Sequence, residues 1–401
     1  MRPPSCVIVV ENLPVPFDRR VWQEACALRD AGWNVSVICP ATEKYPALFE
    51  ELDGIAVYRH PLPLEAKGKW GFCAEYATAL FHEFRLLLKV SRERGFDVIQ
   101  ACNPPDLIFL TALPFKLAGK KFVFDHHDIS PELFAVKFGS KGLLHRVLTL
   151  LERWTFRAAD LVISTNETFR RIAVQRGGKH PSDVVTVYSV PDTSRIRRVE
   201  PDPELRKGKR LVLGYVGIIN AQDGVDHVVR AVRHMTRELG VSDVHTVVVG
   251  DGPALPAAQA LAAELGVEDD ITFTSYLSGP ALLAALSSFD IGIIPDPVNE
   301  YNDKISMNKV FEYSALGIPV VSYELSETRR LLGPALAAAD SDDPAGLARA
   351  VNALAQDEDR RRALGQAVAA LARRDFSWER EAEKYVRAFN GLLAQPELVE
   401  A

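Results

Sequence analysis

Short runs of consecutive aliphatic residues alternate along this chain with segments of helical periodicity. The first run, Val7–Val10, is of the kind found in strands that are buried on both faces. A helical segment from about Arg19 to Ala31 follows, and Val35–Cys39 forms the next apolar run. Strand, helix and strand in this order predict a right-handed crossover between parallel strands. We therefore expect an α/β protein with helices on both faces of its sheets.

The pattern occurs twice, and a stretch rich in proline and charge separates the two halves. This stretch, 191–208, is nearly free of large apolar residues, so we place an interdomain linker there. A length of 401 residues also suits about two domains. We expect an N-terminal Rossmann-like domain over 1–190, a C-terminal one over 209–375 and a final helical segment over 376–401.

The overall composition disfavours several classes of protein. The net charge of -6 provides no general attraction to nucleic acid. The five cysteines lie in the first quarter without C-x-x-C spacing, which favours reduced, buried thiols of a cytoplasmic protein over a metal site or disulfides. No apolar run reaches the ~18–20 residues of a membrane span, and the start of the chain becomes polar too soon for a signal peptide.

The segment from Ile291 to Ser322 combines a buried strand, a loop and a short helix. Lys304 lies in the loop, and Lys309 lies near the start of the helix, where free backbone N–H groups and the helix dipole favour an anion. Glu312 follows three residues after Lys309, on roughly the same helical face. A phosphate beside a hydroxyl-rich sugar would suit this pair. The segment therefore predicts nucleotide or nucleotide-sugar binding.

Four polar residues, Asp125 to Asp128, follow the predicted strand Phe122–Phe124. Ligands gather at the carboxyl ends of strands in open α/β sheets. The two adjacent histidines can be structural, or they can bind metal, although nothing nearby completes a ligand set and consecutive residues rarely face one ion. The interpretation that we prefer is a histidine that an aspartate orients and that polarises a substrate hydroxyl.

Other candidate groups follow predicted strands as well. Gly217 and Gly250 each close a strand, and Tyr276 follows a third. Glycines of this kind are common in α/β proteins, but the shared position of these groups at carboxyl ends favours a ligand-binding crevice.

The loop after the first strand contains no glycine, so the G-x-G-x-x-G fingerprint of NAD-dependent dehydrogenases is missing there. Asp18 opens the following helix instead. One interpretation is an N-cap aspartate followed by two solvated arginines. The other places Arg19 or Arg20 at a cleft, facing an anionic ligand.

The predicted helix Gly142–Ala159 carries both apolar and basic side chains. One interpretation is a surface helix that packs on the sheet, and the alternative is contact with an anionic membrane surface. The apolar residues are Leu143, Leu144, Val147, Leu151 and Trp154, and the basic ones are Lys141, His145, Arg146, Arg153 and Arg157.

Five stretches together make the chain recognisable. They are FDRRVWQEACALRDAGWNVSVICP, FDHHDISPE, LGYVGIINAQDGVD, VVVGDGP and SMNKVFEYSALGIPVVS. With these stretches in order, the chain resembles a bacterial family 4 glycosyltransferase over nearly its whole length. The resemblance implies the GT-B fold, in which two facing, doubly wound Rossmann-like domains form an interdomain cleft. The final helix, with Trp378, resembles the one that crosses back to the N-terminal domain in this fold.

The resemblance also implies an activity. A retaining enzyme of hexosyltransferase type would move a sugar from a UDP- or GDP-linked donor, held mainly by the C-terminal domain, without a cofactor or metal. The acceptor, held mainly by the N-terminal domain, would be a hydroxyl of a sugar, a lipid-linked molecule or a small molecule. Such enzymes assemble surface polysaccharides, glycolipids or natural-product glycosides, in the cytoplasm or at the inner face of the membrane.

Roles can be carried over by position from the family. Glu312 would bond the nucleotide ribose, and Lys309 would contact the diphosphate. Gly250 with Tyr276 and Leu277 would line the base. The residues that would lie near the transferred sugar are His127 and Asp128.

The chain departs from the family pattern at the expected cations. Ile218 and Asp223 stand where many relatives have an arginine and a lysine, and Lys304 stands where many have a glutamate. The departing diphosphate gains charge and needs fixed cations nearby. Lys304, Lys309 and an arginine at position 19 or 20 would have to supply them.

Two other functions stay open from the sequence. A nucleotide-sugar epimerase on the same fold would need an acid–base set around the sugar, which only the cluster of residues 126–128 offers. A catalytically silent nucleotide-binding protein would account for the missing arginine and lysine.

Overall fold

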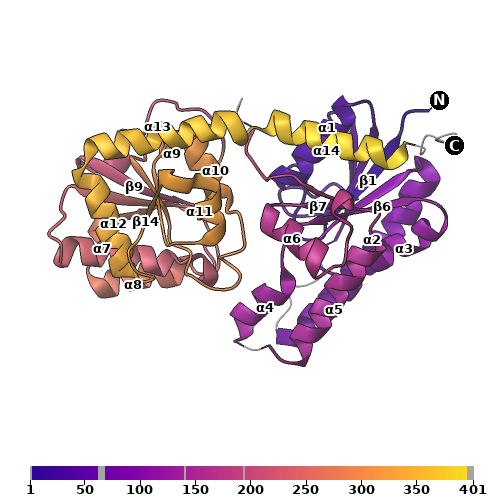
Figure 1. The fold of residues 1–401 in the computed structure, drawn as a ribbon, viewed down its shortest axis with the longest axis horizontal. Helices are drawn as coiled ribbons and strands as arrows, with labels where there is room; N and C mark the ends of the chain where they lie inside the picture. The colour runs from indigo at the N-terminus through magenta and orange to yellow at the C-terminus, as the bar shows by residue number, and fades with distance from the viewer. Residues whose placement is uncertain (1, 62–67, 140, 193–194, 395–401) are drawn as a thin grey trace. The chain divides into compact units, whose positions relative to one another are not determined.

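The computed structural model describes residues 2–61, 68–139, 141–192 and 195–394. The chain divides into two compact units, each a sheet flanked by helices (Figure 1). Met1–Ser189 and Arg380–Ala401 form the first unit, and Val190–Glu379 forms the second. The expected α/β class with parallel sheets is confirmed.

In the first unit, the described residues form an eight-stranded sheet in the order β3-β4-β2-β1-β5-β6-β7-β8. Neighbouring strands are parallel except β3 and β4. The strands are β1 Ser5–Val9, β2 Asn34–Pro40, β3 Phe49–Leu52, β4 Ile55–His60, β5 Val98–Cys102, β6 Lys121–His126, β7 Leu161–Ser164 and β8 Val184–Thr186. The helices are α1 Arg19–Asp30, α2 Gly68–Glu93, α3 Phe109–Leu117, α4 Ser130–Phe138, α5 Leu143–Ala158, α6 Glu167–Gln175 and, from Arg380 onward, α14 Trp378–Leu393.

The central strands of this unit are covered on both faces. All five residues of β1 are buried, so the strand has no polar face. On one side, β1 shares a core with Leu87 and Val90 of α2. On the other side, Gln100 of β5 bonds to Glu24 of α1 and Tyr385 of α14. The helix that ends the chain thus forms part of the layer that covers the first sheet.

The second unit contains a six-stranded parallel sheet in the order β11-β10-β9-β12-β13-β14 among its described residues. The strands are β9 Leu211–Val216, β10 Val244–Val249, β11 Ile271–Phe273, β12 Ile291–Ile294, β13 Val320–Ser322 and β14 Leu336–Ala338. The helices are α7 Val225–Arg237, α8 Leu255–Leu265, α9 Gly279–Ser287, α10 Asn308–Ala315, α11 Ser326–Leu332, α12 Pro344–Gln356 and α13 Glu358–Asp375.

Part of the expected linker packs on the second unit. Arg198 Nε donates to Leu316 O at 2.7 Å, and Val199 N donates to Ser287 Oγ at 3.0 Å. Polar backbone groups with partners of this kind belong to a folded domain. The structure therefore assigns Val190 and the following residues to the second unit, with 193 and 194 outside the described residues.

Candidate functional site

The loops after β9, β10 and β11 are joined by backbone hydrogen bonds at the carboxyl edge of the second sheet. Gly217 N donates to Val249 O at 3.1 Å, and Gly250 N donates to Ser275 O at 3.0 Å. A Cβ atom on Gly250 would lie 1.8 Å from Gly217 O, and its φ of +145° is rare for other residues. Contact between the loops therefore requires glycine at position 250, and the structure brings Gly217 and Gly250 together.

Apolar side chains are exposed at this same edge. Ile218, Tyr276 and Val298 are 62%, 52% and 40% exposed, and they follow β9, β11 and β12. They are the only exposed large hydrophobic side chains in the described part of the second unit. Single exposed residues are ordinary, but three at one carboxyl edge indicate a binding surface. Leu277 is half-buried next to Tyr276.

Lys309, at the second position of α10, is buried and paired with a carboxylate. Its Nζ donates to Asp296 Oδ2 at 2.7 Å and lies 4.7 Å from the centre of the Tyr215 ring. Burial raises the pKa of Asp296, and Lys309 opposes that rise. Because an ammonium has three N–H donors, this bond orients Lys309 without using all of them. Asp296 was not among the predicted residues, although it lies just beyond the carboxyl end of β12.

The start of α10 has further groups that suit an anion. No side chain of the described residues caps its first turn. Ser306 Oγ, two residues before the helix, is buried and makes no hydrogen bond to the described residues. Free N–H groups and the helix dipole attract negative charge at such a position. A cation, a hydroxyl and backbone donors are therefore present together at one end of one helix.

Glu312 and Lys304 are the other two charged residues predicted for the site in Ile291–Ser322, and their surroundings differ. Glu312 lies one turn after Lys309 on α10 and is half-buried. Lys304, in the loop before α10, donates to Glu300 Oε1 at 3.3 Å. The structure thus groups Lys309 and Glu312 on one helix, whereas an acidic neighbour partly neutralises Lys304.

Asp223, which stands where many relatives have a lysine, has a structural role here. Its carboxylate accepts a hydrogen bond from Asn220 N at 2.8 Å and closes the turn before α7. A lysine could not accept this bond. The acidic residue is therefore explained by local capping.

In the first unit, Asp125 at the end of β6 is the centre of a buried polar network. Arg20 Nη2 donates to Asp125 Oδ1 at 2.9 Å, and His127 Nε2 lies 2.6 Å from Asp125 Oδ2. Burial alone would raise the pKa of Asp125, but Arg20 and His127 hold it well below its usual range. Arg20 Nε also lies 3.1 Å from His127 Nε2 and 3.3 Å from Asp125 Oδ2. An ionised carboxylate only accepts, and Asp125 is the nearer partner of Nε2, so we assign the ring proton to Nε2 and the lone pair to Nδ1, with Arg20 Nε donating to Asp125.

The network continues away from His127 toward the end of the chain. Arg20 also pairs with Glu24 at 3.0 Å. Gln100 Nε2 donates to Glu24 Oε2 at 2.7 Å and to Asp125 Oδ2 at 3.2 Å. Tyr385 of α14 donates its hydroxyl hydrogen to Gln100 Oε1. A continuous set of bonds therefore connects α14 to the aspartate that orients His127.

The sequence left open which aspartate would orient a histidine and which arginine would face a cleft. Asp125 lies against His127, and the backbone of Asp128 is held by Asn103, whose Nδ2 donates to Asp128 O at 2.7 Å. Arg20, not Arg19, enters this network, while Arg19 is half-buried one position earlier on α1. One residue along a helix is a rotation of about 100°, so only one of two adjacent arginines faces the sheet.

His126 has a structural environment. It is fully buried and packs against the rings of Phe124, Phe156 and Phe169. Burial lowers the pKa of His126 to about 3, so the ring is neutral at ordinary pH. Of the two adjacent histidines, only His127 has a partly exposed side chain.

One group in the described residues has ligand atoms close enough to share a metal ion, namely Cys102, Asp125 and His127. The chemistry of this group does not suit a metal. Burial raises the pKa of the Cys102 thiol well above its usual range, whereas a metal requires the thiolate. In addition, Asp125 already binds the guanidinium of Arg20, which would repel a second cation.

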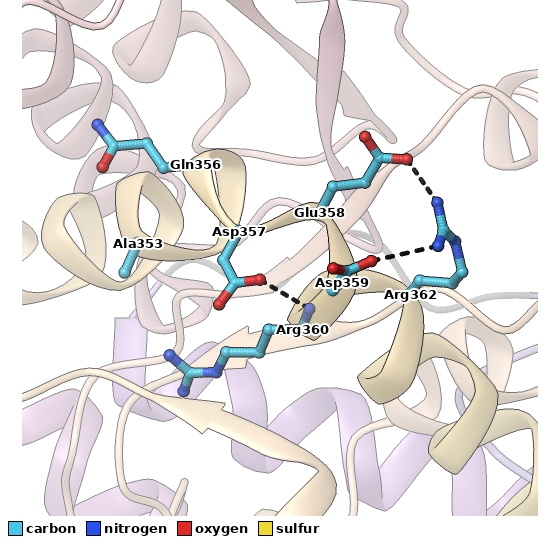
Figure 2. A pocket seen from close by; sticks show the side chains of 7 residues that line it. All are labelled: Ala353, Gln356, Asp357, Glu358, Asp359, Arg360 and Arg362. Carbon is cyan, nitrogen blue, oxygen red and sulfur yellow. Dashed lines mark hydrogen bonds and ion pairs between the residues drawn. The ribbon is translucent and has the colours of Figure 1, made fainter.

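A polar pocket lies between α12 and α13, and Figure 2 shows that its acidic side chains bond to Arg362 or to the backbone of Arg360. Asp357 Oδ1 accepts from Arg360 N at 2.8 Å, and Arg362 pairs with Glu358 at 2.6 Å. The adjacent Ala355 O accepts from Arg210, which precedes β9, so the pocket borders the amino edge of the sheet. It lies at the opposite edge from the groups at the start of α10.

Two family models match the chain. Residues 18–190 match "Glycosyl transferase 4-like domain", and residues 210–357 match "Glycosyl transferases group 1". The chain is 27% identical to the 2-deoxystreptamine glucosyltransferase of Streptomyces kanamyceticus over 82% of this chain and 87% of that protein.

Solved structures show the same fold. A sucrose-phosphate synthase from Thermosynechococcus elongatus has a TM-score of 0.78 at 15% identity and covers 97% of this chain and 99% of its own. Anabaena HepE in complex with UDP-glucose has a TM-score of 0.70 at 16% identity, over 96% of this chain and 99% of its own. These likenesses show the GT-B fold.

Replacing the arginine of the buried network tests its structural importance. Arg20→Met leaves Asp125 and Glu24 without their cation, so we expect the free energy of unfolding to fall by about 3–5 kcal/mol. Arg29→Met on the same helix removes a partly exposed ion pair with Asp30 and should cost at most about 1 kcal/mol. Urea denaturation followed by circular dichroism measures both. Equal losses in the two variants would contradict the assignment.

Proposed function

We propose a donor site, an acceptor position and a reaction course for this chain, which belongs to the family 4 glycosyltransferases. Its activity is transfer of a sugar from a nucleotide sugar to a hydroxyl acceptor. Neither the epimerase alternative nor the catalytically silent alternative gains support from the matched families and relatives, which are transferases.

The donor diphosphate binds at the start of α10. The observation that supports this most directly is the buried Lys309, held by Asp296 beside a helix start and a Ser306 hydroxyl that have no side-chain partner among the described residues. Glu312, one turn later, accepts hydrogen bonds from the ribose hydroxyls. Tyr276 and Leu277, with the turn at Gly250, face the base. Lys304 and Gly217 border the phosphates, and a UDP-linked donor is the first choice because a neighbour of this fold binds UDP-glucose.

Transfer proceeds with retention. The acceptor oxygen forms its bond to the anomeric carbon as the bond to the diphosphate oxygen breaks, and the departing phosphate takes the acceptor proton. Negative charge grows on the diphosphate during this step. Lys309 and the N–H groups of α10 stabilise that charge, which is the main contribution that the protein makes to the rate.

The acceptor and the transferred sugar lie near His127 in the first unit. Asp125 fixes the ring through Nε2, so Nδ1 is the atom that accepts a hydrogen bond from a sugar hydroxyl. Asp128 and Arg19 flank this position. His127→Ala should therefore slow transfer while the donor affinity stays the same.

A nucleotide-sugar panel tests the whole proposal. Donor binding is measured by thermal shift, because a bound ligand stabilises the folded state. Each donor that binds is then incubated with mixed hydroxyl acceptors. We expect nucleotide release that depends on the acceptor, with UDP-glucose tried first. Sugar isomerisation without acceptor, or no binding of any nucleotide, would contradict the proposal.

Two substitutions test the donor site. Lys309→Met and Glu312→Ala should each lower kcat/KM at least ~10-fold, because about 1.4 kcal/mol of transition-state binding is lost. Arg349→Met removes a surface ion pair with Asp340 and serves as the control. Initial rates over a range of donor concentrations separate KM from kcat. Wild-type rates in both site variants would show that the diphosphate binds elsewhere.

The reaction is independent of metal. Arg20 at Asp125 and the protonated Cys102 thiol support this. Activity should be unchanged after treatment with EDTA, and Cys102→Ala should retain it. Loss of activity with EDTA that added Mg²⁺ or Mn²⁺ restores would show that a cation assists the diphosphate.

The enzyme contacts an anionic membrane through helices α3 to α5. Among the described residues, no helix is both long enough and apolar enough to span a bilayer. However, α5 packs against α3 and α4, and large apolar side chains are exposed on all three. They are Leu110, Leu113, Leu117, Phe138, Leu143, Leu144, Val147, Leu150 and Trp154. Exposed basic residues on α5 accompany them, as on helices that lie in a membrane surface.

Vesicle sedimentation tests this contact. The wild-type protein should bind vesicles with phosphatidylglycerol more strongly than vesicles of phosphatidylcholine alone. A double change, Leu143→Ser with Leu144→Ser, should weaken binding several-fold without lowering the unfolding midpoint. Leu48→Ser, at an exposed leucine away from this face, is the control. Equal binding of both vesicle types would overturn the proposal.

A further inference from the structure

Glu83 of α2 is a fully buried carboxylate without a hydrogen bond to any described residue, at either oxygen. It lies four residues before Leu87 and seven before Val90, on the stripe of α2 that packs against the sheet. Such a stripe is normally apolar, and a buried polar group without a hydrogen bond is costly. The packing of the fold therefore does not explain why a carboxylate is present at position 83.

Other polar groups meet the same part of α2 from the carboxyl edge of the first sheet. Val9 of β1 and Tyr58 of β4 belong to the core beneath α2. Because side chains alternate along a strand, His60, two residues after Tyr58 in β4, continues on that face, and Glu11 follows the end of β1. Glu11 is close enough to Glu83 for its charge to act on it, and both are buried.

Two histidines, His60 and His82, also belong to this group of polar residues at the carboxyl edge of the first sheet. His60 Nδ1 donates to Pro61 O at 3.0 Å, which leaves the lone pair on Nε2, and this buried atom makes no hydrogen bond to the described residues. The ring of His82 on α2 stacks on His60, with the ring centres 5.8 Å apart. Burial lowers the pKa of His60, so it does not supply a cation to Glu83. His82 is half-buried and is the member of the set that borders solvent.

We propose that Glu83, reinforced by the charge of Glu11, binds the ammonium group of an amine-bearing acceptor. An ammonium supplies what Glu83 lacks, a positive charge and N–H donors. A neutral hydroxyl would supply donors but no charge. A metal ion is disfavoured because, in the described residues, only the cluster at Asp125 brings three ligand atoms close enough to share one. The proposal rests on the proposed binding of the acceptor by the first unit.

The amine group can come from two sources, a free amino sugar or aminocyclitol, or an amino sugar attached to a lipid. Both present the same ammonium beside hydroxyl groups. Soluble glucosamine and 2-deoxystreptamine represent the first source. Vesicles that contain a glucosamine-headed lipid represent the second, and binding to one source only identifies it.

Proton release on binding gives a direct test that needs no donor. Burial and the charge of Glu11 raise the pKa of Glu83 to about 8, so near pH 7 the free protein holds a proton there. An ammonium that replaces this proton releases it to the buffer. Calorimetric titration with glucosamine, in buffers of different ionisation enthalpy, should show close to one proton released. Glucose, which lacks the amine, should bind at least ~10-fold more weakly and release none.

Glu83→Gln keeps the volume and removes the charge. The folded carboxyl keeps its proton up to about pH 8, whereas the unfolded one loses it near 4.5, so wild-type stability falls as the pH rises between these values. Glu11, His60 and His82 titrate nearby and are the same in both proteins. The variant should therefore unfold several degrees higher than the wild type at pH 8, with a smaller difference toward pH 4.5, and should lose the preference for glucosamine.

Glu93→Gln on the same helix is the matched control, since Glu93 is about half exposed and bonded to Tyr58. It should change neither binding nor the pH dependence of stability. Equal binding of glucosamine and glucose by the wild type, or an unchanged preference in Glu83→Gln, would overturn the amine site. If no nucleotide sugar supports transfer to any acceptor, the proposed donor site and reaction course fail, while the calorimetric result still decides the amine site.

Discussion

The buried ion pair between Arg20 and Asp125 is the interaction on which the first unit depends. Two charges inside a protein are stable only when each has a partner and its remaining donors and acceptors are used. Here the carboxylate accepts from Arg20, Gln100 and His127, and the guanidinium also donates to Val187 O at 2.9 Å. The hydrogen bonds of this one ion pair thus connect α1, β5, β6 and the end of β8. The same carboxylate orients the ring of His127, so the interaction that stabilises the fold also fixes the position of this histidine.

The second unit also contains a buried ion pair, and the cation of this pair is Lys309. Lys309 is held by Asp296 and by the ring of Tyr215, and its charge is supplemented by the N–H groups at the start of α10. Backbone donors need no counter-ion, so they add positive potential without a cost in charge burial. If the diphosphate binds as proposed, this arrangement would supply positive potential although Ile218 and Asp223 occupy positions where relatives place cations.

Much of the fold could be predicted because buried parallel strands appear as continuous aliphatic runs, such as Val7–Val10. The strand β3 was missed since its residues, FEEL, are at most half-buried at a sheet edge. The sequence left open which arginine and which aspartate form the buried network. Arg20 differs from Arg19 by a helical rotation, and Asp125 from Asp128 by the turn after β6, and neither is visible in composition or spacing. Glu83 was not predicted as a site residue, because it lies in an otherwise apolar stripe of a helix.

The bond from Tyr385 to Gln100 has a consequence for how the protein is made. The first unit includes residues on both sides of the 190-residue stretch Val190–Glu379, so its sheet emerges from the ribosome long before its last helix. At about 5–20 residues per second, the ribosome takes roughly 10–40 s to make that stretch. During this interval Gln100 lacks its tyrosine and the face of the sheet beneath α14 is uncovered. The network around His127 is therefore complete only after the second unit has been synthesised.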